Sequence, residues 1–174
     1  MRAGDVYVDG AETFTITRSA AGGDRLHFEL KLGSGASGPP VHTHEEIEEI
    51  EVISGSVIFW LDGVERRFSA GDKFVIPVGC AHTFKNASKT EVLHARGTHS
   101  GRFERLLDQL AAGGPSFLRL ALYLSSVDPR ASYMVNPVVR ASLRVAALFA
   151  RIRGVTVAAA TGAYGLDAPP ASPG

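Results

Sequence analysis

Two histidines separated by one residue begin the part of the sequence that is suited to bind a metal ion. His42 and His44 lie on either side of Thr43 in a stretch that is typical of extended chain. In a strand, alternate side chains project from the same face, so both imidazoles can approach one ion at about 2 Å. Imidazole nitrogen is a common ligand of divalent transition metals. The pair therefore predicts one half of a metal site.

Glu48 is a carboxylate that can complete this half, provided that the chain bends. Four extended residues span roughly 13 Å at about 3.3 Å each, which is too far for Glu48 and His44 to share an ion along a straight strand. We therefore expect a turn between Glu45 and Ile47. Beyond the turn, alternation places Glu48 on the same inward face as Ile50. A lone carboxylate in an apolar interior is costly unless a metal or another cation meets it.

His82 supplies the second half of the predicted site. Pro77 and Gly79 interrupt the preceding strand and turn the chain back, so that His82 lies on a new strand able to cross the first half. Three neutral imidazoles and one carboxylate leave one or two positions open on a six-coordinate ion. This donor set suits divalent Fe, Mn, Ni, Cu or Zn, and the ligand types alone do not choose among them. An open position predicts that a further molecule binds at the metal.

Short strands separated by turn residues must hold these side chains. Segments rich in β-branched and aromatic residues alternate with Gly, Ser, Pro and Asp, which favours an antiparallel sandwich or barrel. The dipeptide Asp62–Gly63 favours a tight hairpin. We expect Phe59, Trp60, Phe74 and Phe84 to line the interior. The expected strands include residues 14–17, 26–30, 50–61, 74–76 and 91–94.

After residue 101 the composition changes to Ala, Leu and Arg, and helices are expected. Gly and Pro mark the ends of three helices, over residues 102–112, 115–125 and 137–153. Residues 1–101 hold 10 Lys and Arg against 14 Asp and Glu, whereas residues 102–154 hold 8 Arg and 3 acids. We therefore predict three parts: a barrel in residues 1–101, a helical extension in residues 102–154 that packs on the barrel or on a dimer partner, and a flexible tail in residues 155–174.

The last predicted helix carries a narrow basic stripe. At about 100° per residue, Arg140, Arg144 and Arg151 fall within about 40° of one another, and apolar side chains cover most of the remaining surface. Such a helix has to bury much of its circumference. Three arrangements are open: packing on the barrel and a dimer partner, a lid over the barrel mouth, or contact with an anionic membrane surface.

The predicted metal ligands lie in two motifs that resemble those of the cupin superfamily. The second motif, Gly-x5-Pro-x-Gly-x2-His-x3-Asn, is matched at every fixed position from Gly71 to Asn86. In the first motif the ligand residues and the spacing from Glu to Gly are intact, whereas Gly38 lies closer to His42 than is usual.

This resemblance covers about residues 20–100 and implies a mainly β fold, with a double-stranded β-helix or jelly-roll barrel followed here by the C-terminal α-helices. It also implies a small-molecule substrate or ligand and, often, a homodimer. Cupins include dioxygenases, oxalate-degrading enzymes, sugar isomerases and epimerases, lyases and non-enzymatic binding proteins, so the fold does not determine the reaction. The implied metal ligands are His42, His44, Glu48 and His82.

The leading functional hypothesis is an oxygenase-type enzyme that acts on a small organic molecule at a mononuclear centre of three histidines and one glutamate. The alternatives are a metal-dependent isomerase or lyase, in which zinc acts as a Lewis acid on a carbonyl, and a non-catalytic cupin that binds a small ligand or a metal. No separate general base stands out in the sequence, so the catalytic residues are left open.

Three further histidines, His27, His94 and His99, lie outside the motifs, and we expect none of them to bind the metal directly. His94 remains a candidate acid or base because alternation alone leaves its direction open. We expect Cys80 to be a small buried residue rather than a redox group, and Asn86 to make a turn or strand-end hydrogen bond. The acidic neighbours of the predicted ligand are expected to be solvated: Glu45, Glu46, Glu49 and Glu51.

The overall composition narrows the partners and the compartment. The formal net charge is zero, so nothing indicates a nucleic-acid partner. A single cysteine excludes an internal disulfide framework. The first residues lack the apolar run of a secretory signal, and no stretch approaches the roughly 20 apolar residues of a membrane span. We therefore expect a cytoplasmic protein.

Overall fold

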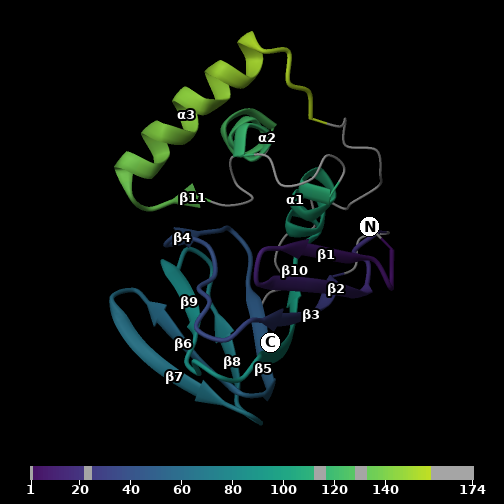
Figure 1. The fold of residues 1–174 in the computed structure, drawn as a ribbon, viewed down its shortest axis with the longest axis vertical. Helices are drawn as coiled ribbons and strands as arrows, with labels where there is room; N and C mark the ends of the chain where they lie inside the picture. The colour runs from purple at the N-terminus through teal and green to yellow at the C-terminus, as the bar shows by residue number, and fades with distance from the viewer. Residues whose placement is uncertain (1, 22–24, 112–116, 128–132, 158–174) are drawn as a thin grey trace, which may run out of the picture.

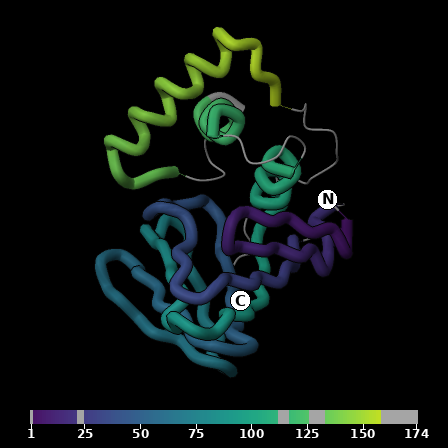
Figure 2. The backbone as a smooth tube through the Cα atoms, viewed as in Figure 1, coloured from purple at the N-terminus to yellow at the C-terminus, as the bar shows by residue number. Residues whose placement is uncertain are grey.

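The computed structural model describes residues 2–21, 25–111, 117–127 and 133–157. Two antiparallel sheets form the lower part of the molecule in Figure 1, and the helices lie above them. The backbone trace in Figure 2 shows the same two parts. The predicted mainly β fold, a double-stranded β-helix with C-terminal helices, is confirmed. Most of the predicted flexible tail, residues 158–174, lies outside the described residues.

The first sheet has the strand order β1-β2-β3-β10-β5-β8, and all its neighbouring strands are antiparallel. Alternate residues of β3 and β10 are buried, as expected for strands with one face on a core. Its strands are β1 (Val6–Asp9), β2 (Glu12–Arg18), β3 (Leu26–Leu32), β5 (Glu48–Ser54), β8 (Lys73–Ile76) and β10 (Leu93–His99).

The second sheet has the strand order β11-β4-β9-β6-β7 and is also antiparallel. The hairpin between β6 and β7 turns at Asp62 and Gly63, whose φ angles are 46° and 89°. Two positive φ angles at the centre of a two-residue turn match the twist of the flanking strands, as the dipeptide predicted. Its strands are β4 (His42–Thr43), β6 (Ser56–Leu61), β7 (Val64–Ser69), β9 (His82–Asn86) and β11 (Tyr133–Met134).

Two of the expected strands differ substantially from the structure. Residues 50–61 are divided at Gly55, where the chain leaves the first sheet and enters the second. Gly55 has a φ of 81°, and a Cβ at this position would lie 3.1 Å from the carbonyl oxygen of Val92, so a glycine is required here. The strand expected over residues 91–94 exists with other bounds: β10 begins at Leu93 and continues to His99 because it pairs with β3 over its whole length.

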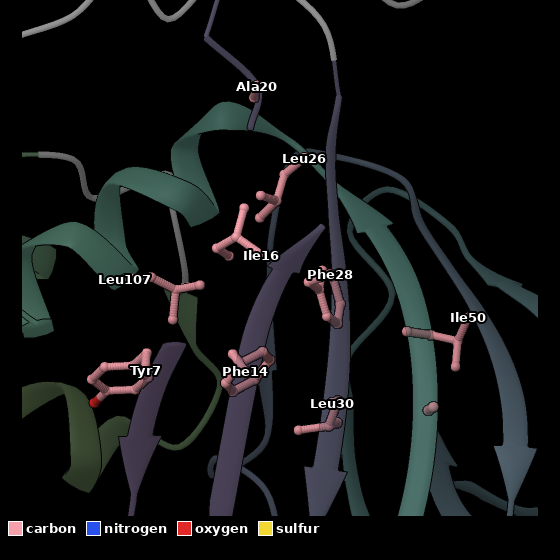
Figure 3. Close-up of a cluster of buried hydrophobic side chains, with 10 residues drawn as sticks. Tyr7, Phe14, Ile16, Ala20, Leu26, Phe28, Leu30, Ile50 and Leu107 are labelled. Carbon is pink, nitrogen blue, oxygen red and sulfur yellow. The ribbon is translucent and has the colours of Figure 1, made fainter. Parts of the chain in front are cut away.

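Apolar side chains fill two regions of the barrel. In one, Phe14 and Phe28 lie with ring centroids 5.6 Å apart, and Figure 3 shows Leu107 of helix α1 (Gly101–Ala111) beside Tyr7 and Ile16. In the other, the rings of Phe59, Phe74 and Phe84 pack together as expected. Trp60 does not join them: it is 38% exposed because it alternates with the buried Phe59.

The helical layer consists of α1 (Gly101–Ala111), α2 (Phe117–Leu122), the π-helix η1 (Tyr123–Val127) and α3 (Pro137–Ile152). The first and last agree with the sequence prediction to within a residue. Helix α3 begins where the Asn136 side chain accepts hydrogen bonds from the backbone N–H groups of Val138 and Val139. Its buried face packs on α2 and η1. None of the helices in the described ranges is long and apolar enough to cross a membrane.

Strand β11 joins the helical layer to the second sheet. It pairs with β4, and the register places Tyr133 opposite Thr43 and Met134 opposite His42. This strand was not predicted from the sequence, because two residues are too few to show an alternating pattern. The consequence is that the C-terminal part of the chain lies directly beside the strand that carries His42.

Candidate metal centre

Three of the predicted ligands meet at the pairing of β4 with β9. His42 and His82 are opposite each other in the antiparallel register, and their ring centroids are 4.3 Å apart. His44 lies 4.9 Å from His82 by the same measure. All three side chains are buried, and each offers a ring nitrogen within 4.8 Å of the others. The two motifs therefore meet in space, as the spacing predicted.

Glu48 reaches this group because the chain bends after β4. The bend lies at residues 45–46, inside the predicted turn, and Glu48 is the first residue of β5. The backbone N–H of Gly79 donates to the carbonyl of His44 at 2.9 Å, which holds the bend against the second motif. Oε2 of Glu48 then lies 3.6 Å from Nε2 of His44 and 3.7 Å from Nε2 of His82. The structure thus brings all four predicted side chains together.

The bend is also tied to helix α1. Arg102 lies 3.0 Å from Glu46, and both side chains are largely buried. Glu46 was expected to be solvated, and this expectation is wrong. The ion pair connects the start of α1 to the segment that separates His44 from Glu48 and stabilises the position of both.

Each motif histidine is oriented by a backbone carbonyl two residues away. Nδ1 of His42 lies 3.0 Å from the carbonyl oxygen of Pro40, Nδ1 of His44 lies 2.8 Å from that of Glu46, and Nδ1 of His82 lies 3.0 Å from that of Cys80. A carbonyl only accepts, so each Nδ1 carries the proton and donates. Each Nε2 then has a free lone pair. Metal-binding histidines are commonly oriented by such a contact at the other ring nitrogen.

The four residues fit a divalent metal ion. Among the described residues, Nε2 of His44 is buried and has no hydrogen-bond partner, which is costly unless another ligand meets it. Its distance of 3.6 Å from the Glu48 carboxylate is too long for a hydrogen bond. Donor atoms about 2 Å from one ion lie roughly 3 to 4 Å from each other, and the Glu48 carboxylate lies at 3.6 and 3.7 Å from Nε2 of His44 and of His82.

Burial and neighbouring charge favour the protonation states that ligands need. Burial, together with His82, lowers the pKa of His42 to about 4, and burial also lowers the pKa of His82. Burial acts against ionisation of Glu48, but the imidazoles around it outweigh burial and lower its pKa. Burial lowers the pKa of His44 as well, yet the Glu48 carboxylate outweighs it and the net direction is upward. Neutral His42 and His82 and an ionised Glu48 are the forms that bind a cation, and the upward direction at His44 reflects the same neighbouring carboxylate.

His99 is a residue beside the site that the sequence analysis set aside. Its ring centroid lies 4.6 Å from that of His44, and one of its nitrogens lies within 4.8 Å of the ligand atoms of His44 and Glu48. Burial lowers the pKa of His99 to about 3. The signal was present in the alternation of β10, where Leu93, Ala95, Gly97 and His99 all face inward.

The other two histidines face outward. Nε2 of His94 lies 3.2 Å from Oε2 of Glu29, on the face of β10 opposite to His99. His94 therefore does not line the barrel. His27 contacts Arg18 on the outer face of β3.

Two further motif residues have structural roles. Cys80 is buried in an apolar cluster, and burial raises the pKa of its thiol, so it is the small buried residue that was expected. The side-chain amide of Asn86 faces the carbonyl oxygens of Leu32, Gly33 and Glu91 at 3.0, 3.1 and 2.8 Å. Asn86 therefore fastens the end of β9 to two neighbouring segments.

Comparisons with known proteins agree with this architecture. Residues 28–95 match the family model described as "Cupin domain". No curated protein sequence matches the chain. One solved structure of similar fold is KdgF from Halomonas sp., which has 25% sequence identity and a TM-score of 0.46. The match covers 54% of this chain and 84% of that chain.

Two other solved structures are similar to the same extent. The polyketide cyclase RemF from Streptomyces resistomycificus has 23% identity, covers 56% of this chain and 75% of its own, and gives a TM-score of 0.47. A predicted oxalate decarboxylase from Thermotoga maritima has 22% identity, covers 54% of this chain and 88% of its own, and gives a TM-score of 0.47. These similarities concern the fold alone. The match of residues 28–95 and the two antiparallel sheets together support the assignment of this barrel to the cupin superfamily.

Proposed function

We propose that this protein is a metal-dependent enzyme of the oxygenase type, acting on a small organic molecule at a mononuclear centre formed by His42, His44, Glu48 and His82. One observation carries the proposal. Each Nδ1 of the three histidines faces a backbone carbonyl, which leaves three Nε2 lone pairs beside one carboxylate in a buried space. Such an arrangement serves no packing purpose, and a bound divalent ion would satisfy every one of these groups.

A redox-active divalent ion at these residues would supply oxygen activation, whereas zinc would supply Lewis-acid polarisation of a carbonyl. The chain's own contribution is to hold the donors. Its carbonyls fix the tautomers, the Gly79 and Arg102 contacts fix the bend, and burial keeps water away from the nitrogens. Because the chain supplies four donors, a six-coordinate ion retains positions for a substrate or for dioxygen.

Metal-assisted isomerisation or elimination is the second candidate function. The observation that favours it is His99, a buried imidazole next to the proposed ligands that does not belong to either motif. Isomerases and lyases need a group that holds or moves a proton, and histidine is the residue most often used for this purpose. The two candidates differ in their need for dioxygen.

The first experiment is elemental analysis of protein purified without an affinity-metal step, expressed as metal per chain. Near-stoichiometric Fe, Mn, Ni or Cu leads to oxygen-consumption assays with phenolic and polyketide-like substrates. Zinc leads to isomerase and lyase assays under anaerobic conditions. We expect oxygen-dependent turnover that is lost in His82→Ala and retained in His94→Ala, the outward-facing histidine on the same barrel.

Two results would contradict the proposal. Protein that contains no metal and takes up none when it is added would leave a small-ligand binding protein as the better hypothesis. Turnover that proceeds equally well without oxygen would replace the oxygenase by the isomerase or lyase. The homodimer and the cytoplasmic location stay predictions, which light scattering and cell fractionation can test.

A further inference from the structure

His99 differs from the three motif histidines in the direction of the hydrogen bond at Nδ1. The backbone N–H of Ser100 donates to Nδ1 of His99 at 2.8 Å, and the Ser100 hydroxyl lies 3.4 Å from the same nitrogen. A nitrogen that accepts from an N–H group carries no proton, so a neutral ring places its proton on Nε2. The motif histidines have the opposite tautomer, because their Nδ1 atoms face carbonyl oxygens.

This tautomer makes His99 unsuitable as a metal ligand. A ligating nitrogen must offer a lone pair to the ion. In His99 the Nδ1 lone pair is occupied by the Ser100 N–H, and Nε2 carries a proton. Closeness to the site therefore does not make His99 a fourth imidazole ligand.

The sheet places His99 beside Glu48. Thr98 is opposite Glu49 in the pairing of β10 with β5, so the next pair of residues, His99 and Glu48, lies at the same level on the inner face. A nitrogen of His99 lies within 4.8 Å of a ligand atom of Glu48. The Glu48 carboxylate is thus a charged acceptor within reach of the buried His99 ring.

We propose that His99 is a positioning residue whose Nε2–H donates to the Glu48 carboxylate and keeps one carboxylate oxygen turned toward His44 and His82. This inference rests on the proposed metal centre. It predicts that the protein binds its ion with three imidazoles, although four lie in the same buried space. Contacts of this kind to a ligating group commonly change metal affinity by about 10-fold to 100-fold.

Two variants test the positioning role. His99→Gln keeps an N–H donor at a similar distance from the backbone, whereas His99→Leu removes it. We expect both variants to retain near-stoichiometric metal, with His99→Leu binding it about 10-fold or more weakly and His99→Gln close to the parent. X-ray absorption should count three imidazoles in the parent and in both variants. A count of four that falls to three in His99→Gln would overturn the inference.

Nitrogen NMR of the metal-free protein gives a second, independent measurement. Long-range correlation of ring protons with ring nitrogens should place the His99 proton on Nε2 and the protons of His42 and His82 on Nδ1. A proton on Nδ1 of His99 would contradict the inference. If the parent takes up no metal at all, the proposed function fails, whereas this tautomer measurement still decides the role of His99.

A second inference concerns helix α3 and rests on a different observation. Its buried face packs on α2 and η1, but the opposite face is also apolar and is exposed. Together with Phe117 of α2, this face lines a groove of about 710 Å³. Figure 1 shows α3 at the outer margin of the helical layer. The exposed apolar residues of α3 are Val138, Val145, Leu148, Phe149 and Ile152, at 51 to 72% exposure.

The charges of α3 indicate what kind of surface covers this face. The helix contains three arginines, Arg140, Arg144 and Arg151, and no Asp or Glu between Pro137 and Ile152. Arg144 is exposed next to the apolar face. Antiparallel pairing with α3 of a second copy would bring arginines together without an acid to neutralise them. Charge complementarity therefore favours an anionic partner over a second copy.

We infer that the exposed face of α3 docks on an anionic lipid surface. The apolar side chains would enter the boundary between headgroups and acyl chains, and the arginines would contact lipid phosphates. Basic residues near such a surface add electrostatic attraction to the anionic headgroups. Because no described helix can cross a membrane, this contact would be peripheral.

Co-sedimentation with vesicles tests this second inference. We expect binding to phosphatidylcholine vesicles that contain phosphatidylglycerol, no binding to pure phosphatidylcholine, and weaker binding at high salt. Phe149→Asp should abolish binding and Arg144→Glu should weaken it about 10-fold or more. Arg66→Glu, an exposed arginine of β7, is the matched control and should bind like the parent. Equal binding to neutral vesicles, or none to either, would overturn the inference, as would a dimer that Phe149→Asp dissociates in light scattering.

Discussion

His42 of β4 and His82 of β9 lie directly opposite each other, with their ring centroids 4.3 Å apart. This single pair joins two motifs that are 40 residues apart in the sequence. The alignment depends on the register of the two strands, because a slip by one residue would turn one of the two rings to the other face. The site therefore depends on backbone pairing, which substitution of a ligand side chain leaves in place.

Substitution of a proposed ligand is expected to remove the metal and keep the fold. Glu48→Ala and His82→Ala should each retain the far-UV circular dichroism of the parent, while metal per chain falls from near-stoichiometric to background. Each variant removes a donor that lies within 4.8 Å of other proposed donors. Elemental analysis after dialysis measures the effect, and His94→Ala is the control. Stoichiometric metal in both variants would refute the assignment of the site.

Asn86 is predicted to be important for stability rather than for metal binding. Its amide faces three backbone carbonyls, and its Oδ1 accepts from the backbone N–H of Ser88 at 2.9 Å. Asn86→Ala would leave buried carbonyls without a donor, and we expect a loss of roughly 2 to 4 kcal/mol in the free energy of unfolding. Chemical denaturation measures this loss. Lys85→Ala, an exposed neighbour on the same strand, should change stability by less than about 0.5 kcal/mol.

A loss of metal in Asn86→Ala without a loss of stability would contradict this assignment. Asn86→Asp is a stricter test because it keeps the shape and replaces the donating amide by an acceptor. Its carboxylate would face the carbonyl oxygens of Leu32, Gly33 and Glu91, so it should be at least as unstable as Asn86→Ala.

The sequence predicted the motif ligands because their positions follow from local rules. Alternation in β5 placed Glu48 on the inward face with Ile50, and the distance along an extended chain required the bend before it. Pro77 and Gly79 ended β8 and allowed His82 to begin β9. Each of these inferences needs only a few neighbouring residues.

The features that were missed depend on long-range pairing. His99 faces inward because β10 extends to residue 99 by pairing with β3 and β5, and a prediction that ended the strand at residue 94 could not assign its direction. Strand β11 exists only because residues 133–134 meet β4. The division at Gly55 follows from the nearby carbonyl of Val92, which lies 37 residues later in the chain.

We predict that residue 38 must be a glycine because the Phe84 ring packs directly against it. A Cβ at residue 38 would lie 2.5 Å from Cζ of the Phe84 ring, and the backbone N–H of Gly38 donates to the carbonyl of Phe84 at 2.9 Å. Gly38→Ala should therefore destabilise the protein by roughly 1 to 3 kcal/mol, the usual cost of overpacking. Thermal unfolding measures the cost. The double variant Gly38→Ala with Phe84→Leu should recover part of it, and equal losses in the single and double variants would exclude the ring as the cause.

Glu12 is expected to make stability depend on pH at a place remote from the metal centre. Burial, with a smaller contribution from Asp9 opposite it in the β1–β2 hairpin, raises the pKa of Glu12 from 4.5 to about 7. The folded protein therefore binds this proton more tightly than the unfolded chain, and the associated stability is fully present below pH 4.5 and is lost as the pH rises to about 7. Glu12→Gln is neutral at every pH, so it should be more stable than the parent at pH 8 by roughly 1 to 3 kcal/mol and nearly equal to it at pH 5. Urea denaturation at both pH values measures the difference, with the exposed Glu65→Gln as the control. A difference that is the same at pH 5 and pH 8 would show that the Glu12 carboxyl is solvated in the folded protein.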